Sequence, residues 1–312
     1  MFRRFLIILW AVLTVVETAQ AQQEPSFSHY WAMEPSFNPA AAGKEKLLNV
    51  VGAYNMTMVG FEHNPRTMYV AGDAQLSLLG ANHGVGVQLL NDDLGLFSHQ
   101  RLFVQYAYKQ RLFGGVLSAG VQLGLLSEKF KSSGLDLADT KDQAFSQSDE
   151  NGTGTDVSVG LYYMHGPWYV GASALHLTAP DIEIGDRSIL EISRMYYLTG
   201  GYNIRLRNPF LTIHPSVLAR YDGTVYRVDA TARVKYTHEK RVMYAGVGYS
   251  PSNSVTAFIG GNFHGISLGY SYEVYTSALS FGNGSHELIV GYQTELNLYK
   301  KGRNKHQSVR IL

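Results

Sequence analysis

Residues 224–236 alternate between apolar side chains and charged or polar ones, strictly so from Tyr226 to Tyr236. Because successive side chains of a β-strand point to opposite faces, this period of two predicts a strand with one oily and one charged face. The oily face carries Tyr226, Val228, Ala230, Ala232, Val234 and Tyr236, and the other carries Val225, Arg227, Asp229, Thr231, Arg233 and Lys235. Ten residues at about 3.3 Å each, tilted by about 45°, span about 23 Å, which fits an outer-membrane barrel strand with an aromatic girdle at each edge. A soluble sandwich strand can alternate in the same way, so the other segments must decide.

The same alternation recurs along the chain, with Gly, Pro, Asn and Asp marking turns between the runs. It predicts about fourteen strands, near residues 46–59, 65–78, 83–91, 97–110, 114–128, 155–165, 167–178, 194–207, 209–222, 224–236, 240–250, 254–263, 265–275 and 286–298. Pro215 falls inside one of them, where its missing N–H predicts a bulge or a local opening.

The predicted connections sort by length according to their position in the order of strands. The longest, at 129–154, 179–193 and 276–285, are connections five, seven and thirteen, whereas even-numbered ones such as Gly166-Pro167 are short. In an outer-membrane barrel long outer loops alternate with short periplasmic turns, and a soluble sandwich has no reason for this sorting. We therefore predict an all-β fold, a transmembrane outer-membrane β-barrel of about 14 antiparallel strands.

The two ends of the chain differ from the predicted wall. Arg3 and Arg4, an apolar run over 5–16 and the small residues Ala19 and Ala21 predict a secretory signal peptide over 1–21. No later apolar run is long enough for a transmembrane helix. We predict a plug-like or rim segment over 22–45, the barrel over 46–299 and a basic tail over 300–312. The tail is either solvated and attracted to anionic lipid, or it docks a partner.

The proposed plug segment combines ladder-breaking prolines with aromatic side chains that need burial. Its candidate residues for plugging or partner contact are Phe27, Tyr30, Trp31, Phe37, Asn38, Pro39 and Gly43.

A second candidate set consists of ionisable residues that the alternation directs into the lumen. They are His214, Arg220, Arg227, Asp229, Arg233, Lys235 and Glu273, with Glu287 and Glu295 nearby in the last strand. Charges in such a place must be hydrated or paired, because an unpaired desolvated charge costs several kcal/mol. They form either a network that stiffens the barrel or the lining of a conducting pore.

Catalytic and metal-binding patterns are missing from the sequence. It has no nucleophile elbow, P-loop, H-E-x-x-H or dinucleotide fingerprint, and its eleven histidines are scattered. Asp136, Asp139 and Asp142 in the longest loop match no EF-hand spacing, so a solvated loop is favoured over calcium binding. A net charge of +1 gives no sign of nucleic-acid binding. We expect no enzyme, cofactor or metal, with a rim-site hydrolase as the alternative.

Several motifs along the whole mature chain, taken in their order and spacing, resemble those of one family. They are Ser26-Phe27-Ser28-His29-Tyr30, Phe37-Asn38-Pro39-Ala40-Ala41-Ala42-Gly43, Asn91-Asp92-Asp93-Leu94-Gly95, Tyr169-Val170-Gly171-Ala172-Ser173, Leu175-His176-Leu177-Thr178-Ala179-Pro180, Tyr196-Tyr197-Leu198-Thr199-Gly200-Gly201-Tyr202-Asn203, His214-Pro215-Ser216, Gly269-Tyr270-Ser271-Tyr272-Glu273 and Gly284-Ser285-His286-Glu287-Leu288. The chain thereby resembles the PorP/SprF family of type IX secretion-system outer-membrane proteins. The basic tail departs from what we recognise in that family.

The resemblance implies an outer-membrane component of a Gram-negative bacterium that serves the secretion or surface anchoring of proteins with a C-terminal type IX signal. Those substrates are gliding adhesins in some relatives and secreted proteases in others. It also implies contacts with outer-membrane lipid and with the periplasmic ring and lipoprotein components of the machine. The alternative is an outer-membrane channel or a hydrophobic-substrate transporter resembling fatty-acid transporters, which also have about fourteen strands and an N-terminal plug.

Overall fold

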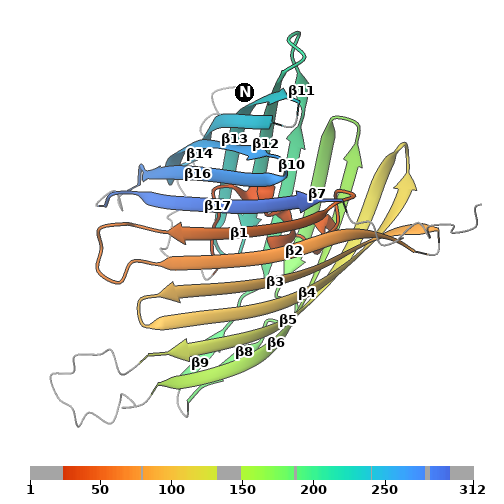
Figure 1. Cartoon of the computed structure of the whole chain (residues 1–312). Helices are drawn as coiled ribbons and strands as arrows, with labels where there is room; N and C mark the ends of the chain where they lie inside the picture. The colour runs from red at the N-terminus through yellow and green to blue at the C-terminus, as the bar shows by residue number, and fades with distance from the viewer. Residues whose placement is uncertain are drawn as a thin grey trace, which may run out of the picture.

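A computed structural model describes residues 24–78, 80–131, 149–185, 188–239, 241–277 and 282–295. Within these ranges fourteen antiparallel strands close into a barrel, as predicted (Figure 1). The wall consists of β1 (Leu48–Met56), β2 (Arg66–Leu78), β3 (Ala81–Leu94), β4 (Phe97–Leu112), β5 (Gly115–Phe130), β6 (Glu150–His165), β7 (Trp168–Leu175), β10 (Met195–Tyr202), β12 (Leu211–Tyr221), β13 (Tyr226–His238), β14 (Arg241–Ser250), β15 (Ser254–Phe263), β16 (Ile266–Tyr275) and β17 (Ser285–Thr294). Each pairs with its neighbour in this order, and β17 returns to β1. Closure removes the unpaired strand edges that lipid cannot satisfy.

The predicted strand over 194–207 is divided into β10 and the two-residue strand β11 (Ile204–Arg205). Both pair with β12 in one register, but the pairs opposite Pro215 and His214 are missing on this side. On its other side Pro215 still pairs with Ala232 of β13. The ladder therefore opens locally, as a residue without an N–H requires, but the expected alternative of a bulge is wrong because the register is unchanged.

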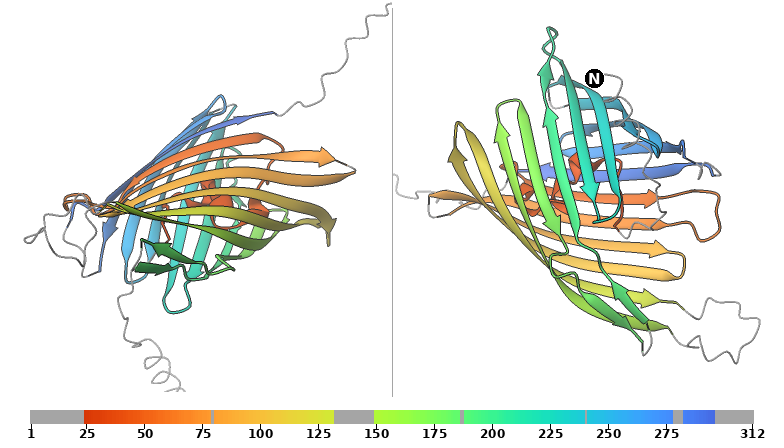
Figure 2. Two further views of the ribbon diagram at one scale, coloured as in Figure 1. Left: turned by 90° about the horizontal axis from the view of Figure 1, so that it is seen from below. Right: turned by 180° about the vertical axis from the view of Figure 1, so that it is seen from behind.

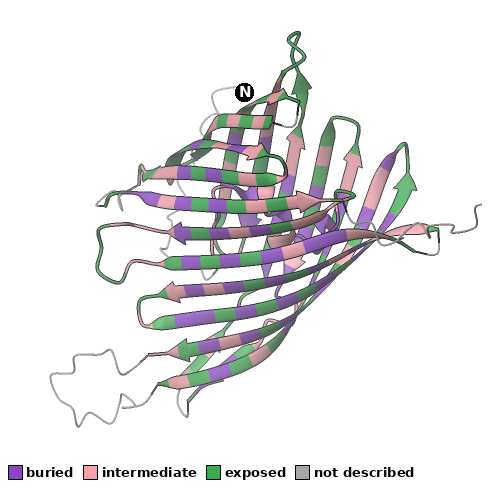
Figure 3. Ribbon diagram, in the orientation of Figure 1, coloured by how far each residue is buried: buried purple, intermediate pink, exposed green. Residues whose placement is uncertain are grey.

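The two faces of the wall differ in exposure in the way the alternation requires (Figure 3). In β13 Tyr226, Val234 and Tyr236 are exposed, whereas Thr231 is buried. The outward row of β14 and β15 includes Val247 and Ile259, which are 60% and 62% exposed. An apolar outer face on a closed barrel is the arrangement that lipid requires. No helix among the described residues is long and apolar enough to cross a membrane.

The longest connections lie at one end of the barrel, the odd-numbered end, although the odd-numbered connections 95–96, 222–225 and 251–253 are short. The long connections at this end are 57–65, 176–194, 276–284 and the one between β5 and β6. Residues 132–148 of the β5–β6 connection, which include Asp136, Asp139 and Asp142, lie outside the described residues. Most even-numbered connections are tight turns, and the longer 203–210 contains β11. The predicted loop over 179–193 is a hairpin of β8 (Asp181–Ile184) and β9 (Ser188–Glu191), which we did not predict from the alternation.

Inside the ring of strands runs the N-terminal segment, which we define as residues 24–47 (Figures 1 and 2). It contains three single 3-10 turns, η1 (Tyr30–Ala32), η2 (Glu34–Ser36) and η3 (Pro39–Ala41). Proline opens or nearly opens η2 and η3, where its fixed φ suits a tight helical turn and its missing N–H is not needed. The expected signal peptide over 1–21, residues 296–299 of the expected barrel and the tail over 300–312 lie outside the described residues.

Candidate functional site

The N-terminal segment runs from the odd-numbered end of the lumen to the even-numbered end. At its start Glu24 contacts Arg101, near the start of β4, and His176, just after the end of β7, both at the odd-numbered end of the barrel. At its end Gly43 packs against Ala74 and Gly84, near the short turn between β2 and β3. The segment therefore spans much of the height of the lumen before the chain enters β1 at the short-turn end.

A buried carboxylate on β17 binds the early part of the segment. Glu287 accepts hydrogen bonds from the backbone N–H groups of Ser28 and His29, at 2.7 and 2.9 Å. Its Oε1 also lies 2.7 Å from Nδ1 of the His29 ring. Both side chains are nearly inaccessible to solvent. These three contacts of one carboxylate fix the N-terminal segment to β17, because hydrogen bonds to a charged group are stronger than those between neutral groups.

Tyr30 and Trp31 contact β12 and β13. The Tyr30 hydroxyl lies 3.0 Å from Ser216 Oγ and 3.1 Å from Thr231 Oγ1. The Trp31 ring lies 3.9 Å from the guanidinium carbon of Arg233, within cation–π distance. These contacts place two of the predicted aromatic residues against the charged, lumen-facing side of β13.

Phe37, Asn38 and Pro39 contact the opposite part of the wall. The Asn38 Oδ1 accepts a hydrogen bond from the N–H of Ala40 at 3.0 Å and so caps η3. Its Nδ2 donates to the carbonyl oxygen of Leu161 on β6 at 3.0 Å. The Asn38 side chain therefore satisfies both a backbone N–H of its own turn and a backbone carbonyl of the barrel wall. Phe37 stacks on Tyr197 of β10 with ring centroids 5.6 Å apart, and its carbonyl accepts from a serine on β7.

Glycines in the wall leave the room that the segment occupies. A Cβ at Gly84 would lie 1.9 Å from the carbonyl oxygen of Ala42, and one at Gly120 would lie 2.3 Å from the nitrogen of Ala40. Both clashes are with backbone, which cannot rotate away. Gly43 adopts a φ of +60°, which favours glycine, and its N–H donates to Asp73 at 2.8 Å. Barrel and segment therefore fit one another at the level of the main chain.

A cluster of ionised side chains surrounds the first described residue. Glu24 contacts Arg101 and lies 3.2 Å from Nε2 of His176, whose Nδ1 lies 3.0 Å from Asp156. Burial alone would raise the pKa of Glu24, but the charges of Arg101 and His176 outweigh it and lower that pKa to about 2. Burial alone would lower the pKa of His176, yet the hydrogen bonds with Asp156 and Glu24 raise it to about 9. At neutral pH both groups are charged.

The structure separates the predicted lumen charges into two groups. Arg220, Arg227, Asp229 and Glu273 form a connected network in the half of the barrel near the long connections. Asp229 accepts from Arg220 at 2.7 Å and from Arg227 at 2.9 Å, and Arg227 reaches Glu273 at 3.2 Å. The network extends to the segment through Arg220 and Ser26 Oγ, 2.7 Å apart.

The second group consists of His214, Arg233 and Lys235, in the half near the short turns. None of these three has an ion pair with a described carboxylate. Of the two further glutamates that were expected in the lumen, Glu287 binds the segment and Glu295 follows the end of β17 as an exposed residue.

The β8–β9 hairpin packs into the end of the barrel that carries the long connections. Ile182 and Ile184 are buried in a cluster with Phe103 of β4 and Leu126 of β5. Ile189, in contrast, is 66% exposed. Phe103 also borders a cavity beside Glu24, so it lies between the hairpin and the segment. The hairpin and the N-terminal segment thus fill adjoining parts of one lumen.

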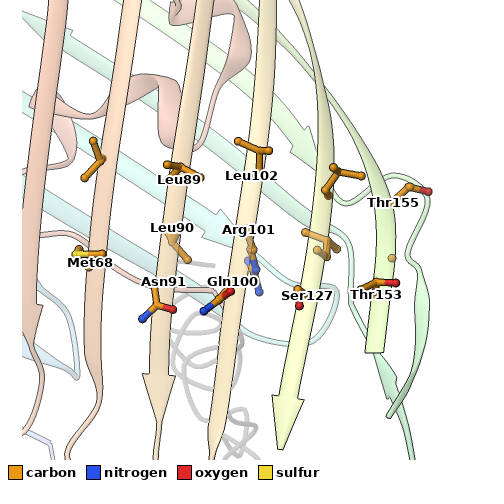
Figure 4. A pocket seen from close by; sticks show the side chains of 14 residues that line it. Met68, Leu89, Leu90, Asn91, Gln100, Arg101, Leu102, Ser127, Thr153 and Thr155 are labelled. Carbon is orange, nitrogen blue, oxygen red and sulfur yellow. The ribbon is translucent and has the colours of Figure 1, made fainter. Parts of the chain in front are cut away.

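The described cavities along the N-terminal segment are small, at about 20, 30 and 130 Å³. A hollow of about 780 Å³ is instead formed by β2 to β6 (Figure 4). Its lining includes the outward-facing Met68, Leu89 and Leu102 and also the buried, inward-facing Leu90, Arg101 and Leu126. Because the exposed side chains that line it belong to the apolar outer surface of the barrel, we assign the hollow to the contact with lipid.

Several residues that hold this arrangement were not singled out from sequence. Glu24, Arg101 and His176 come from three distant parts of the chain, and no local pattern links them. Gly84 and Gly120 sit in alternating strands, where an isolated glycine is a weak sign of close backbone approach. The hairpin had a clearer signal, because Asp181-Ile182-Glu183-Ile184-Gly185 alternates and then turns. Among the described residues, no group of three or more His, Asp or Glu side chains is placed to hold a metal ion.

Comparisons with known proteins agree with this architecture. The family described as "Type IX secretion system membrane protein PorP/SprF" matches residues 19–292. Among solved structures, the chain is similar to the CymD monoaromatic hydrocarbon channel, with 10% identity, a TM-score of 0.50 and coverage of 85% of this chain and 93% of that one. For the Pseudomonas putida toluene transporter TodX the values are 11%, 0.49, 88% and 95%. At such identities the likeness to CymD concerns the fold alone. The comparison with curated proteins gives no match.

Proposed function

The chain belongs to the PorP/SprF family of type IX secretion system membrane proteins, and from this premise we propose that it serves the secretion or surface anchoring of proteins carrying a C-terminal type IX signal. The observation that carries the proposal is the family match over nearly all of the described chain, on a closed barrel of outer-membrane type. Fold and family together support a location in the outer membrane of a Gram-negative bacterium, reached by way of the signal peptide over 1–21.

We infer that the barrel is a non-enzymatic component of the secretion machine and that the N-terminal segment is its plug. Support comes from the way Glu287, Asn38 and Gly120 fix the segment against different parts of the wall. A lumen filled in this manner suits anchoring and assembly better than free diffusion of a solute. The partners we propose are outer-membrane lipid, the periplasmic ring and lipoprotein components, and an adhesin or another type IX substrate.

The proposal is tested by the surface amount of a type IX substrate in cells that lack the gene and carry a plasmid copy. The wild-type copy should restore display. Asn38→Ala should impair it at matched barrel level, because the change removes the cap of η3 and the bond to Leu161 together. The matched control is Asn64→Ala, which loses a side-chain bond in the 57–65 connection, away from the N-terminal segment. Normal display in the deleted strain would refute the function, and normal display with Asn38→Ala would refute the role of the segment.

A further inference from the structure

His214, Arg233 and Lys235 form a basic group on the lumen side of β12 and β13. His214 pairs directly with Arg233 across the two strands, and Lys235 follows two residues later on the same face. The group lies toward the start of β12 and the end of β13, where the connections are even-numbered. Because short turns of outer-membrane barrels face the periplasm, this group faces the periplasmic part of the lumen.

The basic group lacks the carboxylate partners that most other inward-facing bases of the described chain possess, Lys109 being an exception that bonds to a carbonyl and a hydroxyl oxygen. Arg220 and Arg227 pair with Asp229, and Lys44 pairs with Glu34 at 2.6 Å, so Glu34 is already bound. The Nε of Arg233 and the Nε2 of His214 are both buried without a hydrogen-bond partner, but so are the Nε atoms of the paired Arg101 and Arg220. What distinguishes Arg233 and Lys235 is that these two neighbouring cations, which repel one another, have no described carboxylate within ion-pair distance.

The geometry at Arg233 favours a planar anion. Trp31 covers one face of the guanidinium at 3.9 Å, which holds the side chain by cation–π attraction, and the edge formed by the two terminal nitrogens makes no hydrogen bond to a described residue. That edge matches a carboxylate in a two-bond arrangement. Arg233 and Lys235 are one strand repeat apart, roughly 7 Å, which is also the spacing of alternate side chains in an extended peptide.

We propose that Arg233 and Lys235, with His214 beside them, form a binding site for an acidic polypeptide segment of a periplasmic partner, whose carboxylates supply the ion-pair partners that the two cations lack. The site rests on the proposed function in one respect, because that function makes polypeptides the neighbours of this lumen. Lipid headgroups are disfavoured, since the residues that face lipid on β13 are the intervening ones, such as Val234.

The test uses the full-length protein in detergent micelles. The substitution Trp168→Phe leaves Trp31 as the tryptophan of the described residues whose fluorescence is measured. Octaglutamate should change the Trp31 emission and saturate, with an affinity that falls as salt rises, whereas octaglutamine should not. Lys235→Gln should raise the Kd about tenfold, and Arg233→Gln with Lys235→Gln should raise it further, as expected for lost charged hydrogen bonds. For the double variant, binding is followed by the anisotropy of labelled octaglutamate.

The matched control is Arg241→Gln, which removes one positive charge at the same end of the barrel but from an exposed position at the start of β14. Unchanged binding in this control and weakened binding in Lys235→Gln support the proposal. Equal affinities of the wild-type protein and Lys235→Gln overturn it. Displacement of octaglutamate by inorganic phosphate at matched ionic strength also overturns it, in favour of a phosphate site. Because the assay needs no secretion, a failed display experiment leaves this result interpretable.

Discussion

At the scale of single residues, the lumen depends on positions where a side chain is forbidden. Gly84 and Gly120 each admit the backbone of the N-terminal segment at distances that a Cβ would occupy. At Gly52, in contrast, a Cβ would meet no atom closer than 3.8 Å, which is ordinary van der Waals contact. Glycines that contact the N-terminal segment, such as Gly84 and Gly120, cannot be told from Gly52 by sequence, and only their contacts in the structure distinguish them.

Gly120→Ala should therefore displace the segment without unfolding the barrel, because the clash is with Ala40 and Pro39 and not with a neighbouring strand. We expect faster tryptic cleavage at Lys44 in the variant, measured on folded protein selected by its electrophoretic mobility before heating. Gly52→Ala is the control and should be cleaved at the wild-type rate. Equal protection of Lys44 in all three proteins would contradict this role of Gly120.

The ionised cluster at Glu24 predicts a dependence on alkaline pH. Because the pKa of His176 is raised to about 9 in the folded protein from 6.5, its contribution to stability is complete below about pH 6.5 and is lost as pH rises through about 9. Hydrogen exchange of the segment around Glu24 should thus accelerate between pH 7 and pH 10 more than intrinsic chemistry requires. His176→Gln should remove that excess. An identical excess in His176→Gln would assign it to other groups.

At the scale of the elements, each strand separates lipid from the filled lumen. Ala232→Arg places a cation near the middle of β13 on the lipid side and should cost about 2–4 kcal/mol in the free energy of folding into bilayers, whereas Tyr226→Arg, at the strand end, should cost about 0–1 kcal/mol. Similar losses at both depths would contradict the assignment. Thr231→Arg, which alternation alone marks as harmless, is no neutral control, because Thr231 bonds to Tyr30 inside the barrel.

The β8–β9 hairpin offers a matched pair of substitutions. Ile182→Asp should detach the hairpin from Phe103 and Leu126, since truncating a buried isoleucine alone costs about 2–5 kcal/mol and the new charge has no partner in this cluster. Ile189→Asp changes the same residue type at an exposed position of the same hairpin and should have little effect. Limited proteolysis within 176–194 measures both, and equal cleavage would show that the hairpin does not pack inward.

Strands could be predicted from sequence because their signal is local. In β13 the polarity of each side chain indicates whether it faces lipid or the lumen. The lengths of the connections then indicate an outer-membrane barrel, so the barrel type and the number of strands can be predicted without knowing any contact between distant residues. The partners of the segment could not be predicted in this way. His29 meets Glu287 across 258 residues, and only the closed barrel brings them together. Histidines that look alike in sequence consequently differ: His29 and His176 are buried in charged contacts, whereas His165 and His238 are exposed.

At the scale of the whole molecule, the barrel is a closed wall with its own N-terminal segment and one hairpin inside it. The segment is fixed by a carboxylate on β17, hydroxyls on β12 and β13, and main-chain contacts on β5 and β6. A transporter needs a continuous path, whereas a secretion component needs a stable wall and surfaces for partners. Whether the lumen is closed in the resting state therefore decides between these two functions.

The most direct measurement is the conductance of the purified protein in planar lipid bilayers, with and without residues 22–35. The wild-type barrel should show no steady conductance, because the segment and the hairpin occupy the lumen. Deleting 22–35 removes the contacts of Glu24, His29 and Tyr30 and should open stable channels of uniform size. Steady conductance of the wild-type protein, or a deletion variant that folds and remains closed, would contradict the account.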